Sequence, residues 1–235
     1  MIYVMSDLHG SFDKYMEMLE IISFSSNDDL YILGDVVDRG DGSIKILQDM
    51  MTRSNVYPII GNHEIMALDI LKKLSVEIRE DNYDSHINET LMSNLLEYQL
   101  NGGESTLKQF QEQSIEQREA ILEYIEEEFV PYEVVKLKNG NKFLLVHSGL
   151  GNFSKNKSLD DYSLTELTYI RPDYSKRYFS SDNIFIVSGH TPTLEITGEA
   201  KVYKSNNNIC IDCGATYDGG RLACLCLNTF EEYYV

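Results

Sequence analysis

Short apolar runs that stop at glycine-containing polar loops recur along the first sixty residues. Residues 3–5, 30–33 and 57–60 form three such runs, and the loops after them carry carboxylate, amide and imidazole side chains. Apolar runs of this length bounded by glycine are typical of buried strands that end in tight loops. The pattern therefore predicts three buried strands, each followed by side chains that can bind ligands.

Helical spacing fills the intervals between and after these strands. Apolar side chains recur every three or four residues over 12–22, where Ser11 can serve as the N-cap, over 43–51 and over 64–74. Strands and helices then alternate as βαβαβα. This order predicts a parallel sheet whose loops gather at one edge.

Residues 75–130 differ in character from the sequence before them. They are polar and acidic, with helical patterns over 91–100 and 115–129 separated by Asn101-Gly102-Gly103. Because sheet-forming sequence resumes afterwards, we interpret them as a helical lobe inserted into one domain that spans 1–235. The length of the chain suits a single domain.

The remaining sequence returns to strand patterns. Residues 133–137 and 142–146 flank Lys138-Asn139-Gly140-Asn141, which is a hairpin signal. Residues 150–183 are predicted to form a long loop with a short helix near 164–170, and loops this long inside a compact domain are usually functional. Further strands are expected at 184–187 and, as an antiparallel set, at 202–203, 209–211, 222–227 and 230–234.

Composition excludes several classes of protein. Hydrophobic residues make up 43% of the chain and charged residues 25%, as in ordinary globular proteins, and no apolar stretch approaches the roughly 18–20 residues of a membrane helix. Met1 leads directly into strand-and-loop sequence without a signal peptide, so we expect a cytoplasmic location. The net charge of −18 argues against general binding of nucleic acid. The oligomeric state is left open.

Four cysteines, Cys210, Cys213, Cys224 and Cys226, have spacings that superficially suggest a zinc site. Three of them lie within apolar, strand-like runs, where a free cysteine behaves as a small hydrophobic residue. We therefore interpret the four as core residues without disulfides, with a zinc or redox site as the alternative.

Side chains suited to metal binding collect where the predicted strands end. They are Asp7, His9, Asp35, Asn62, His147 and His190. Mixed carboxylate, amide and imidazole ligands suit Mn²⁺, Fe or Zn²⁺, and the lack of thiolates argues against a purely structural zinc. Six ligands are too many for one metal with an open position but suffice for two if Asp35, in the central loop, bridges them. Two metals ~3.5–4 Å apart can promote an in-line displacement at phosphorus. His86, the only histidine outside the loops that follow the predicted strands, is expected at the surface of the helical lobe.

Taken together, these motifs resemble those of the phosphoprotein phosphatase family of metallophosphoesterases. The chain is most similar to the small bacterial and phage-type serine/threonine phosphatases, and the match covers nearly its whole length. Five segments carry the resemblance: Ser6-Asp7-Leu8-His9-Gly10, Gly-Asp-Val-Val-Asp-Arg-Gly at 34–40, Gly61-Asn62-His63-Glu64, His147-Ser148-Gly149 and Gly189-His190-Thr191. The resemblance implies an α/β fold, a calcineurin-like sandwich of two mixed sheets flanked by helices.

The resemblance also divides the ligands between two metals. One metal would be held by Asp7, His9 and Asp35, and the other by Asp35, Asn62, His147 and His190. Two departures from the family pattern, Ser6 in place of glycine and Ser148 in place of alanine, remove no ligand.

Roles in catalysis and in phosphate binding follow from the same resemblance. His63 would be the general acid that protonates the leaving oxygen, oriented by Asp38, because a carboxylate fixes the imidazole tautomer and stabilises its charged form. Arg39 would bind the phosphoryl oxygens. A second phosphate contact is expected from Arg171, although this chain has Tyr169 and Ile170 nearby where relatives often carry tryptophan.

The predicted activity is metal-dependent hydrolysis of a phosphomonoester, with phosphoserine or phosphothreonine of a phosphorylated protein as the preferred substrate. The expected cofactor is a pair of divalent ions, Mn²⁺ first, with Fe or Zn²⁺ as alternatives. One alternative activity on the same scaffold is symmetrical hydrolysis of diadenosine tetraphosphate, or action on another nucleotide or an RNA end. A remote alternative is a non-catalytic module that binds phosphate. The helical lobe and the loop over 150–183 would decide substrate access.

Overall fold

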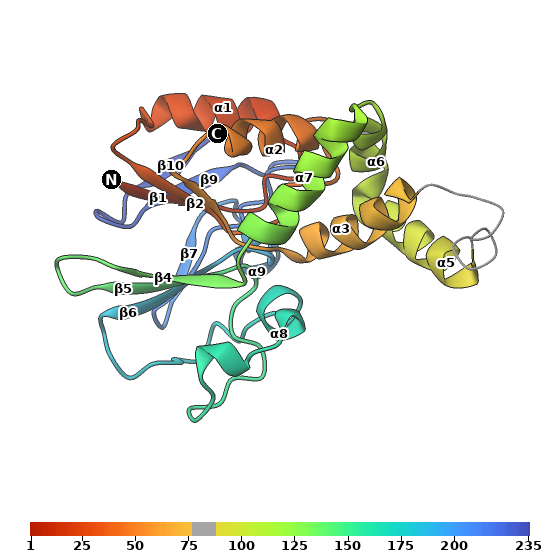
Figure 1. Ribbon diagram of the computed structural model, residues 1–235. Helices are drawn as coiled ribbons and strands as arrows, with labels where there is room; N and C mark the ends of the chain where they lie inside the picture. The colour runs from red at the N-terminus through yellow and green to blue at the C-terminus, as the bar shows by residue number, and fades with distance from the viewer. Residues whose placement is uncertain (77–87) are drawn as a thin grey trace.

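The computed structural model describes residues 1–76 and 88–235 and contains two five-stranded mixed sheets (Figure 1). The first sheet has the strand order β10-β9-β1-β2-β3. Its strands are β1 (Ile2–Met5), β2 (Asp29–Ile32), β3 (Val56–Pro58), β9 (Ala223–Cys226) and β10 (Glu232–Tyr234). The parallel pairing of β1, β2 and β3 confirms the predicted parallel unit, and β9 runs antiparallel to both β1 and β10.

The second sheet has the order β4-β5-β6-β8-β7. Its strands are β4 (Tyr132–Lys136), β5 (Lys142–Val146), β6 (Ile184–Ser188), β7 (Tyr203–Ser205) and β8 (Asn208–Cys210). The predicted hairpin is confirmed as β4 and β5. The prediction of one antiparallel C-terminal set is wrong in part, because β8 pairs parallel with β6 on one side and the chain then crosses to the first sheet for β9 and β10.

Helices lie between the strands and cover the sheets. Figure 1 shows α1 and α2 above the first sheet, with α7 crossing beside them, and α8 on the opposite side of the molecule. The helices are α1 (Phe12–Ile21), α2 (Ser43–Met51), α3 (Asn62–Ser75), α5 (Glu89–Tyr98), α6 (Glu104–Gln111), α7 (Ile115–Glu128), α8 (Leu164–Thr168) and α9 (Thr193–Thr197), with a π-helical turn at Gln99–Gly103 and a 3₁₀ turn at Leu159–Asp161.

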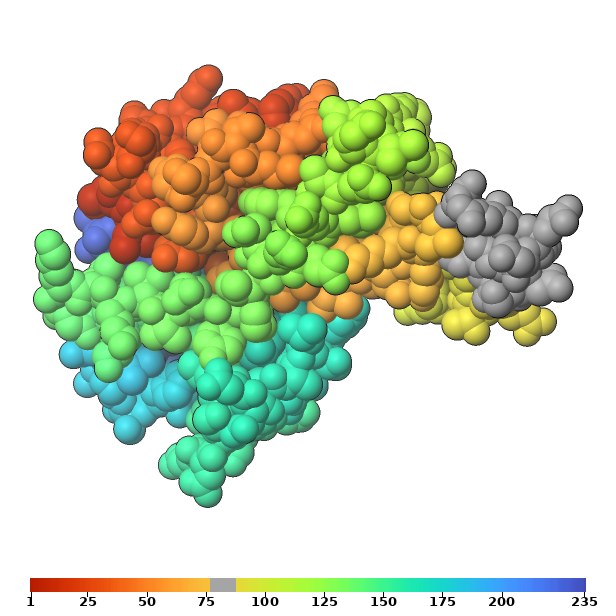
Figure 2. Space-filling model, viewed as in Figure 1, coloured from red at the N-terminus to blue at the C-terminus, as the bar shows by residue number. Residues whose placement is uncertain are grey.

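The alternation of side chains along the strands separates two hydrophobic layers. Tyr3 and Met5 point from β1 into the layer beneath the helices, whereas Val4 points into the layer between the two sheets, where Phe143 and Val187 of the second sheet meet it. A third apolar cluster joins the outer face of the second sheet to the long loop after β5, which projects as the teal segment in Figure 2. Within the described part of the chain, no helix has the length and apolar character needed to cross a membrane.

Three helix predictions need correction. First, α3 begins at Asn62 rather than at residue 64, because extended Gly61 precedes it and Glu64 caps it, so part of the predicted loop is its first turn. Second, the break predicted at Asn101-Gly102-Gly103 is confirmed as a kink in which Gly102 has a non-helical φ of 99°, but the helix that follows it is α6, which was not predicted. Third, Ser11 precedes α1 without a side-chain cap hydrogen bond. The predicted surface position of His86 lies outside the described residues.

Candidate metal and catalytic site

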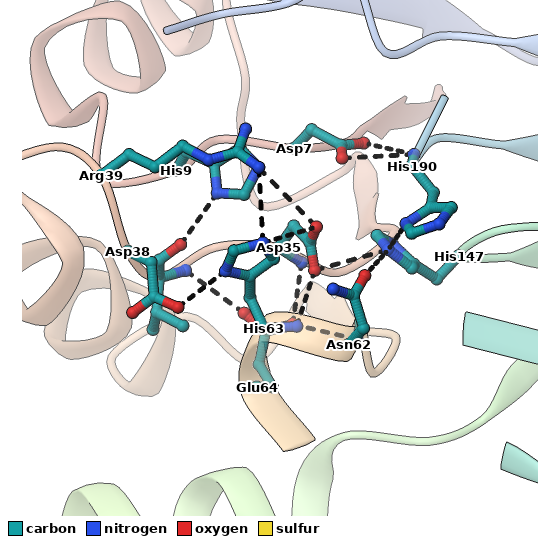
Figure 3. A network of polar contacts seen from close by, with 12 residues as sticks. Asp7, His9, Asp35, Asp38, Arg39, Asn62, His63, Glu64, His147 and His190 are labelled. Carbon is teal, nitrogen blue, oxygen red and sulfur yellow. Dashed lines mark hydrogen bonds and ion pairs between the residues drawn. The ribbon is translucent and has the colours of Figure 1, made fainter. Parts of the chain in front are cut away.

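The loops after β1, β2, β3, β5 and β6 meet at one edge of the sandwich, where Figure 3 shows the predicted site residues gathered around Asp35. Backbone hydrogen bonds join these loops: the N–H of His9 donates to Asp35 O at 2.8 Å, and the N–H of Gly189 donates to His147 O at 2.7 Å. The N–H of His190 donates to both carboxylate oxygens of Asp7, at 3.0 and 3.2 Å. The two sheets therefore bring the six predicted ligands into one region.

The backbone of this region adopts an unusual conformation. Left-handed φ values occur at Asp7 (52°), His9 (43°), Asp35 (54°), Asp38 (74°), Arg39 (66°) and His190 (65°). Outside glycine, this conformation is uncommon, although aspartate tolerates it better than most residues. Each such residue costs on the order of 1–3 kcal/mol, and these costs cluster at functional sites.

Asp35 is common to two groups of potential ligand atoms. One group is Asp35, His9 and His63, and the other is Asp35, His147 and His190; within each group the ligand atoms lie within 4.8 Å of one another. Asp35 Oδ2 is 3.7 Å from His9 Nε2, whereas Oδ1 is 3.4 Å from His147 Nε2. The two oxygens of one carboxylate thus face different imidazoles, which is the arrangement a bridging ligand needs.

If the buried imidazoles are neutral, as they must be to bind a cation, their hydrogen bonds direct ring lone pairs toward neighbouring acceptor atoms. His147 Nδ1–H donates to Leu33 O at 2.6 Å, and His190 Nε2–H donates to Tyr169 O at 3.2 Å. In these neutral tautomers His147 Nε2 carries a lone pair, and it lies 3.2 Å from His190 Nδ1 and 3.0 Å from Asn62 Oδ1. Electron-rich atoms this close repel unless a cation or a proton lies among them. Imidazole, amide and carboxylate donors in this arrangement fit a divalent metal ion.

The pKa shifts of the buried groups also indicate that a positive charge beside Asp35 is favourable. Burial lowers the pKa of His147, but the Asp35 carboxylate outweighs burial and raises this pKa to about 10. Burial would raise the pKa of Asp35, yet the surrounding imidazoles, His147 first, hold it well below its usual range. Burial lowers the pKa of His9 to about 3 and that of His190 to about 4, so both are neutral. His9 Nδ1–H donates to Val37 O at 3.0 Å, which leaves Nε2 available as a ligand atom.

His63 and Asp38 form a buried pair beside this cluster. His63 Nδ1–H donates to Asp38 Oδ2 at 2.7 Å, while His63 Nε2 faces the cluster, 3.9 Å from Asp35 Oδ2. Burial alone would lower the pKa of His63, but the Asp35 and Asp38 carboxylates outweigh it, so the pKa is raised. The hydrogen bond to Asp38 therefore fixes the tautomer and favours the charged imidazole.

Residues of the helical segment between β3 and β4, from α5, α6 and the turn between them, contact the loop that carries Asp38. The sequence did not predict these contacts. The Tyr98 hydroxyl donates to Asp38 Oδ1 at 2.6 Å, and the Thr106 hydroxyl accepts from the N–H of Asp38 at 2.9 Å. The N–H of Arg39 donates to Gly102 O at 2.9 Å. These contacts join positions 60 or more residues apart, and no local pattern in the sequence marks them.

Glu64 is a second residue whose role was missed. Its carboxylate accepts hydrogen bonds from the N–H groups of Asp35 (2.8 Å), Val36 (2.7 Å), Val37 (3.2 Å) and Gly61 (2.9 Å). Glu64 occupies the third position of α3, where a glutamate reaches back to the N-cap residue. That spacing is visible in the sequence, and it ties the loop after β2 to the loop after β3.

The two predicted phosphate-binding arginines lie in different surroundings. Arg39 is exposed, with Nη2 3.4 Å from His63 Nε2 and its guanidinium 5.7 Å from the centre of the Tyr217 ring. Arg171 Nη1 donates to Glu195 Oε2 in α9 at 2.7 Å, and both side chains are about half exposed. The structure therefore places Arg39 beside the His63–Asp38 pair and Arg171 in a surface ion pair, and their contacts with phosphate stay predictions.

The four cysteines are all buried and free, which agrees with their interpretation as core residues. Cys210 Sγ lies 3.1 Å from Thr191 O, and burial raises the pKa of Cys213 to about 12. Among the described residues, neither group of close ligand atoms contains a cysteine.

Comparison with known proteins identifies the family. The sequence profile of the calcineurin-like phosphoesterases matches residues 1–218, so the chain belongs to this family and is a metallophosphoesterase, a hydrolase. The family depends on two metals, and the predicted fold class is confirmed.

The curated relatives match only part of this chain in sequence. The chain is 33% identical over 88 residues to the symmetrical bis(5'-nucleosyl)-tetraphosphatase of Wigglesworthia glossinidia brevipalpis, which covers 37% of this chain and 32% of that protein. It is 37% identical over 71 residues to the enzyme of the same name from Haemophilus ducreyi, covering 29% and 26%. The matched segments thus span about a third or less of the length of these relatives.

Solved structures share the fold over the whole chain. The crystal structure of a candidate diadenosine tetraphosphatase superposes with a TM-score of 0.67 at 17% identity, covering 100% of this chain and 92% of that one. A serine/threonine phosphatase from Saccharomyces cerevisiae superposes with a TM-score of 0.53 at 14% identity, covering 95% and 72%. At these identities the likeness shows the fold alone.

Proposed function

We propose that this chain hydrolyses a phosphoanhydride bond of a nucleotide, with symmetrical dinucleoside tetraphosphates as its substrates. The relatives that match its sequence are named for that reaction, and so the alternative activity is favoured over the protein phosphatase activity expected first. Because the match covers only part of each relative, the substrate is a proposal for this chain.

The observation that carries the catalytic proposal is the position of Asp35 between two ligand clusters, next to the His63–Asp38 pair. Asp7, His9, Asp35, Asn62, His147 and His190 would hold two divalent cations. When bound, such a pair supplies Lewis acidity to a phosphoryl group and the means to make a nucleophile from water near neutral pH.

The chain's own side chains supply the remaining chemistry. Arg39 binds phosphoryl oxygens through its guanidinium and offsets the negative charge that the acidic chain presents to an anionic substrate. The oxygen of a water molecule that has lost one proton to solvent forms the new bond to phosphorus as the bond from phosphorus to the leaving oxygen breaks. His63 gives its Nε2 proton to that leaving oxygen, while Asp38 holds the ring in place through Nδ1.

The test compares substrates for the purified chain supplied with Mn²⁺. We expect diadenosine tetraphosphate to have a higher kcat/KM than a phosphoserine peptide or adenosine monophosphate, with adenosine diphosphate as the sole nucleotide product. An Asp35→Asn preparation made in parallel controls for contaminating hydrolases. A preference for the phosphopeptide, or formation of ATP and AMP in equal amounts, would overturn the proposal.

A further inference from the structure

A cavity of about 300 Å³ has Tyr98 in its wall, the residue whose hydroxyl donates to Asp38 of the His63–Asp38 pair. It is bordered by α3, by α5 and by the residue that follows α8, and its walls include Ile65, Met66, Asn94, Glu97, Tyr98 and Tyr169. Figure 2 shows the outline of the molecule indented between the teal segment around α8 and the yellow helix α5.

Two of the cavity walls are shared with the candidate site. The Tyr98 hydroxyl donates to Asp38, and the Tyr169 carbonyl accepts from Nε2 of the predicted ligand His190. Ile65 and Met66 follow His63 within the first turns of α3. A substrate phosphate held at the site would therefore present the rest of the substrate to this cavity.

The lining favours a flat, uncharged group that carries N–H donors. Ile65 and Met66 are apolar and half-buried, and the ring of Tyr169, which is 40% exposed, offers a surface for stacking. The Glu97 carboxylate is exposed, and in the described part of the chain it makes no hydrogen bond or ion pair. Among the described residues, no side chain that lines the cavity is basic, which disfavours a second phosphate there.

The size of the cavity further restricts its occupant. Ligand pockets in proteins range from roughly 300 to 1,000 Å³, so this one is at the lower limit. A single nucleobase fills a space of this kind with its faces against aromatic and apolar groups. The exocyclic amine of adenine is a donor suited to the carboxylate of Glu97.

We propose that this cavity is a nucleobase subsite that binds an amino-substituted purine of the substrate, with Tyr169 stacking on the base and Glu97 accepting from its amine. The proposal rests on the proposed function, since it assumes that the substrate is a nucleotide. In this proposal, the helical segment and the loop after β5 recognise the nucleoside, and the loops at the strand ends act on the phosphate.

The test uses two inhibitors of p-nitrophenyl phosphate hydrolysis, ADP and pyrophosphate, which share a diphosphate but differ in the base. Tyr169→Leu removes the ring and keeps the carbonyl that holds His190. The matched control is Tyr57→Leu, since Tyr57 is 39% exposed and stacks on Tyr31 in the first sheet, with ring centres 5.0 Å apart. A third variant, Glu97→Gln, removes the charge and keeps the shape.

We expect Tyr169→Leu to weaken ADP inhibition about tenfold, a typical loss for one stacked base, with pyrophosphate inhibition unchanged. Tyr57→Leu should alter neither inhibitor, and Glu97→Gln should reduce the preference for ADP over UDP, whose base lacks the amine. Equal weakening of both inhibitors, or no change for ADP, would overturn the subsite.

Calorimetric titration of ADP into the Mn²⁺-loaded variants gives the same comparison without turnover. The result is separable from the test of the proposed function. If the chain fails to cleave diadenosine tetraphosphate while ADP binding still depends on Tyr169, the proposed substrate falls and the subsite stands. If the chain cleaves diadenosine tetraphosphate but neither cleavage nor ADP binding depends on Tyr169, the proposed substrate stands and the subsite falls.

Discussion

The Tyr98 hydroxyl donates a hydrogen bond to Oδ1 of Asp38 at 2.6 Å, while the other oxygen of the same carboxylate accepts from His63 at 2.7 Å. Tyr98 ends α5, far along the chain from the loop that carries Asp38. Burial and the neighbouring Asp38 raise the pKa of Tyr98 well above its usual range, so the hydroxyl remains a donor. The helical segment between β3 and β4 thereby fixes the orientation of the His63–Asp38 pair.

Tyr98→Phe should lower kcat about tenfold with KM little changed, because Asp38 loses one of its two side-chain partners and no longer holds His63 rigidly. A hydrogen bond to a charged group contributes about 1.5–3 kcal/mol, so stability should also fall. Steady-state kinetics and denaturant unfolding measure both effects.

Tyr15→Phe is the matched control for this change. Tyr15 of α1 is also buried, and its hydroxyl donates to the carboxylate of Asp49 in α2 at 2.9 Å, a pair that contains none of the predicted site residues. It should lose stability but keep kcat. Equal losses of kcat in the two variants would show that the effect of Tyr98 is general destabilisation.

His63→Asn should lower turnover without loss of metal, and the loss should depend on the leaving group. A poor leaving group such as an alkoxide needs the proton, whereas p-nitrophenolate leaves readily without it. We expect kcat/KM to fall by about 10²–10⁴-fold for an alkyl phosphate and much less for p-nitrophenyl phosphate. An equal loss for both substrates would rule out the acid role.

Asp35→Asn should reduce metal binding itself, because the two oxygens of this carboxylate face the imidazoles of the predicted ligands His9 and His147. Changes in residues that merely support metal ligands cost about 10–100-fold in affinity, so a bridging ligand should cost at least about 100-fold. Calorimetric titration with Mn²⁺ measures the loss. Wild-type affinity in this variant would show that Asp35 is not a ligand.

Metal binding should release a proton and strengthen as the pH rises. With its pKa at about 10, His147 is protonated at neutral pH in the metal-free protein, and it must lose that proton before Nε2 can bind a cation. The affinity for Mn²⁺ should therefore rise about tenfold per pH unit between about pH 6 and pH 8. Titrations in buffers of different ionisation enthalpy count the protons, and an affinity independent of pH would contradict the assignment.

The strand-end residues could be predicted because their signals are local. Asp35 and Asp38 follow an apolar run within a few residues, and His147 and His190 follow two others in the same way. Since parallel strands deliver such loops to a common edge, periodicity was enough to expect the cluster. The two mixed sheets were implied by the family resemblance, whereas the strand patterns alone predicted a parallel sheet and an antiparallel set.

The supporting contacts could not be predicted because they depend on tertiary packing. Tyr98 and Thr106 lie 60 and 68 residues from Asp38. The helical pattern over 91–100 does not mark Tyr98 as a partner of Asp38, and no pattern predicts α6, the helix of Thr106. The break expected at Asn101-Gly102-Gly103 is present as a kink, but nothing in the sequence indicates that it brings the carbonyl of Gly102 to the N–H of Arg39. The side-chain pairing of Arg171 with Glu195 has no sequence signal either.

Anomalous X-ray scattering from a crystal of the protein soaked in Mn²⁺ tests the central claim most directly. The account predicts two anomalous peaks about 3.5–4 Å apart, one on each side of the Asp35 carboxylate, with His9 beside one and His147 and His190 beside the other. A single peak, no peak, or peaks away from Asp35 would contradict it.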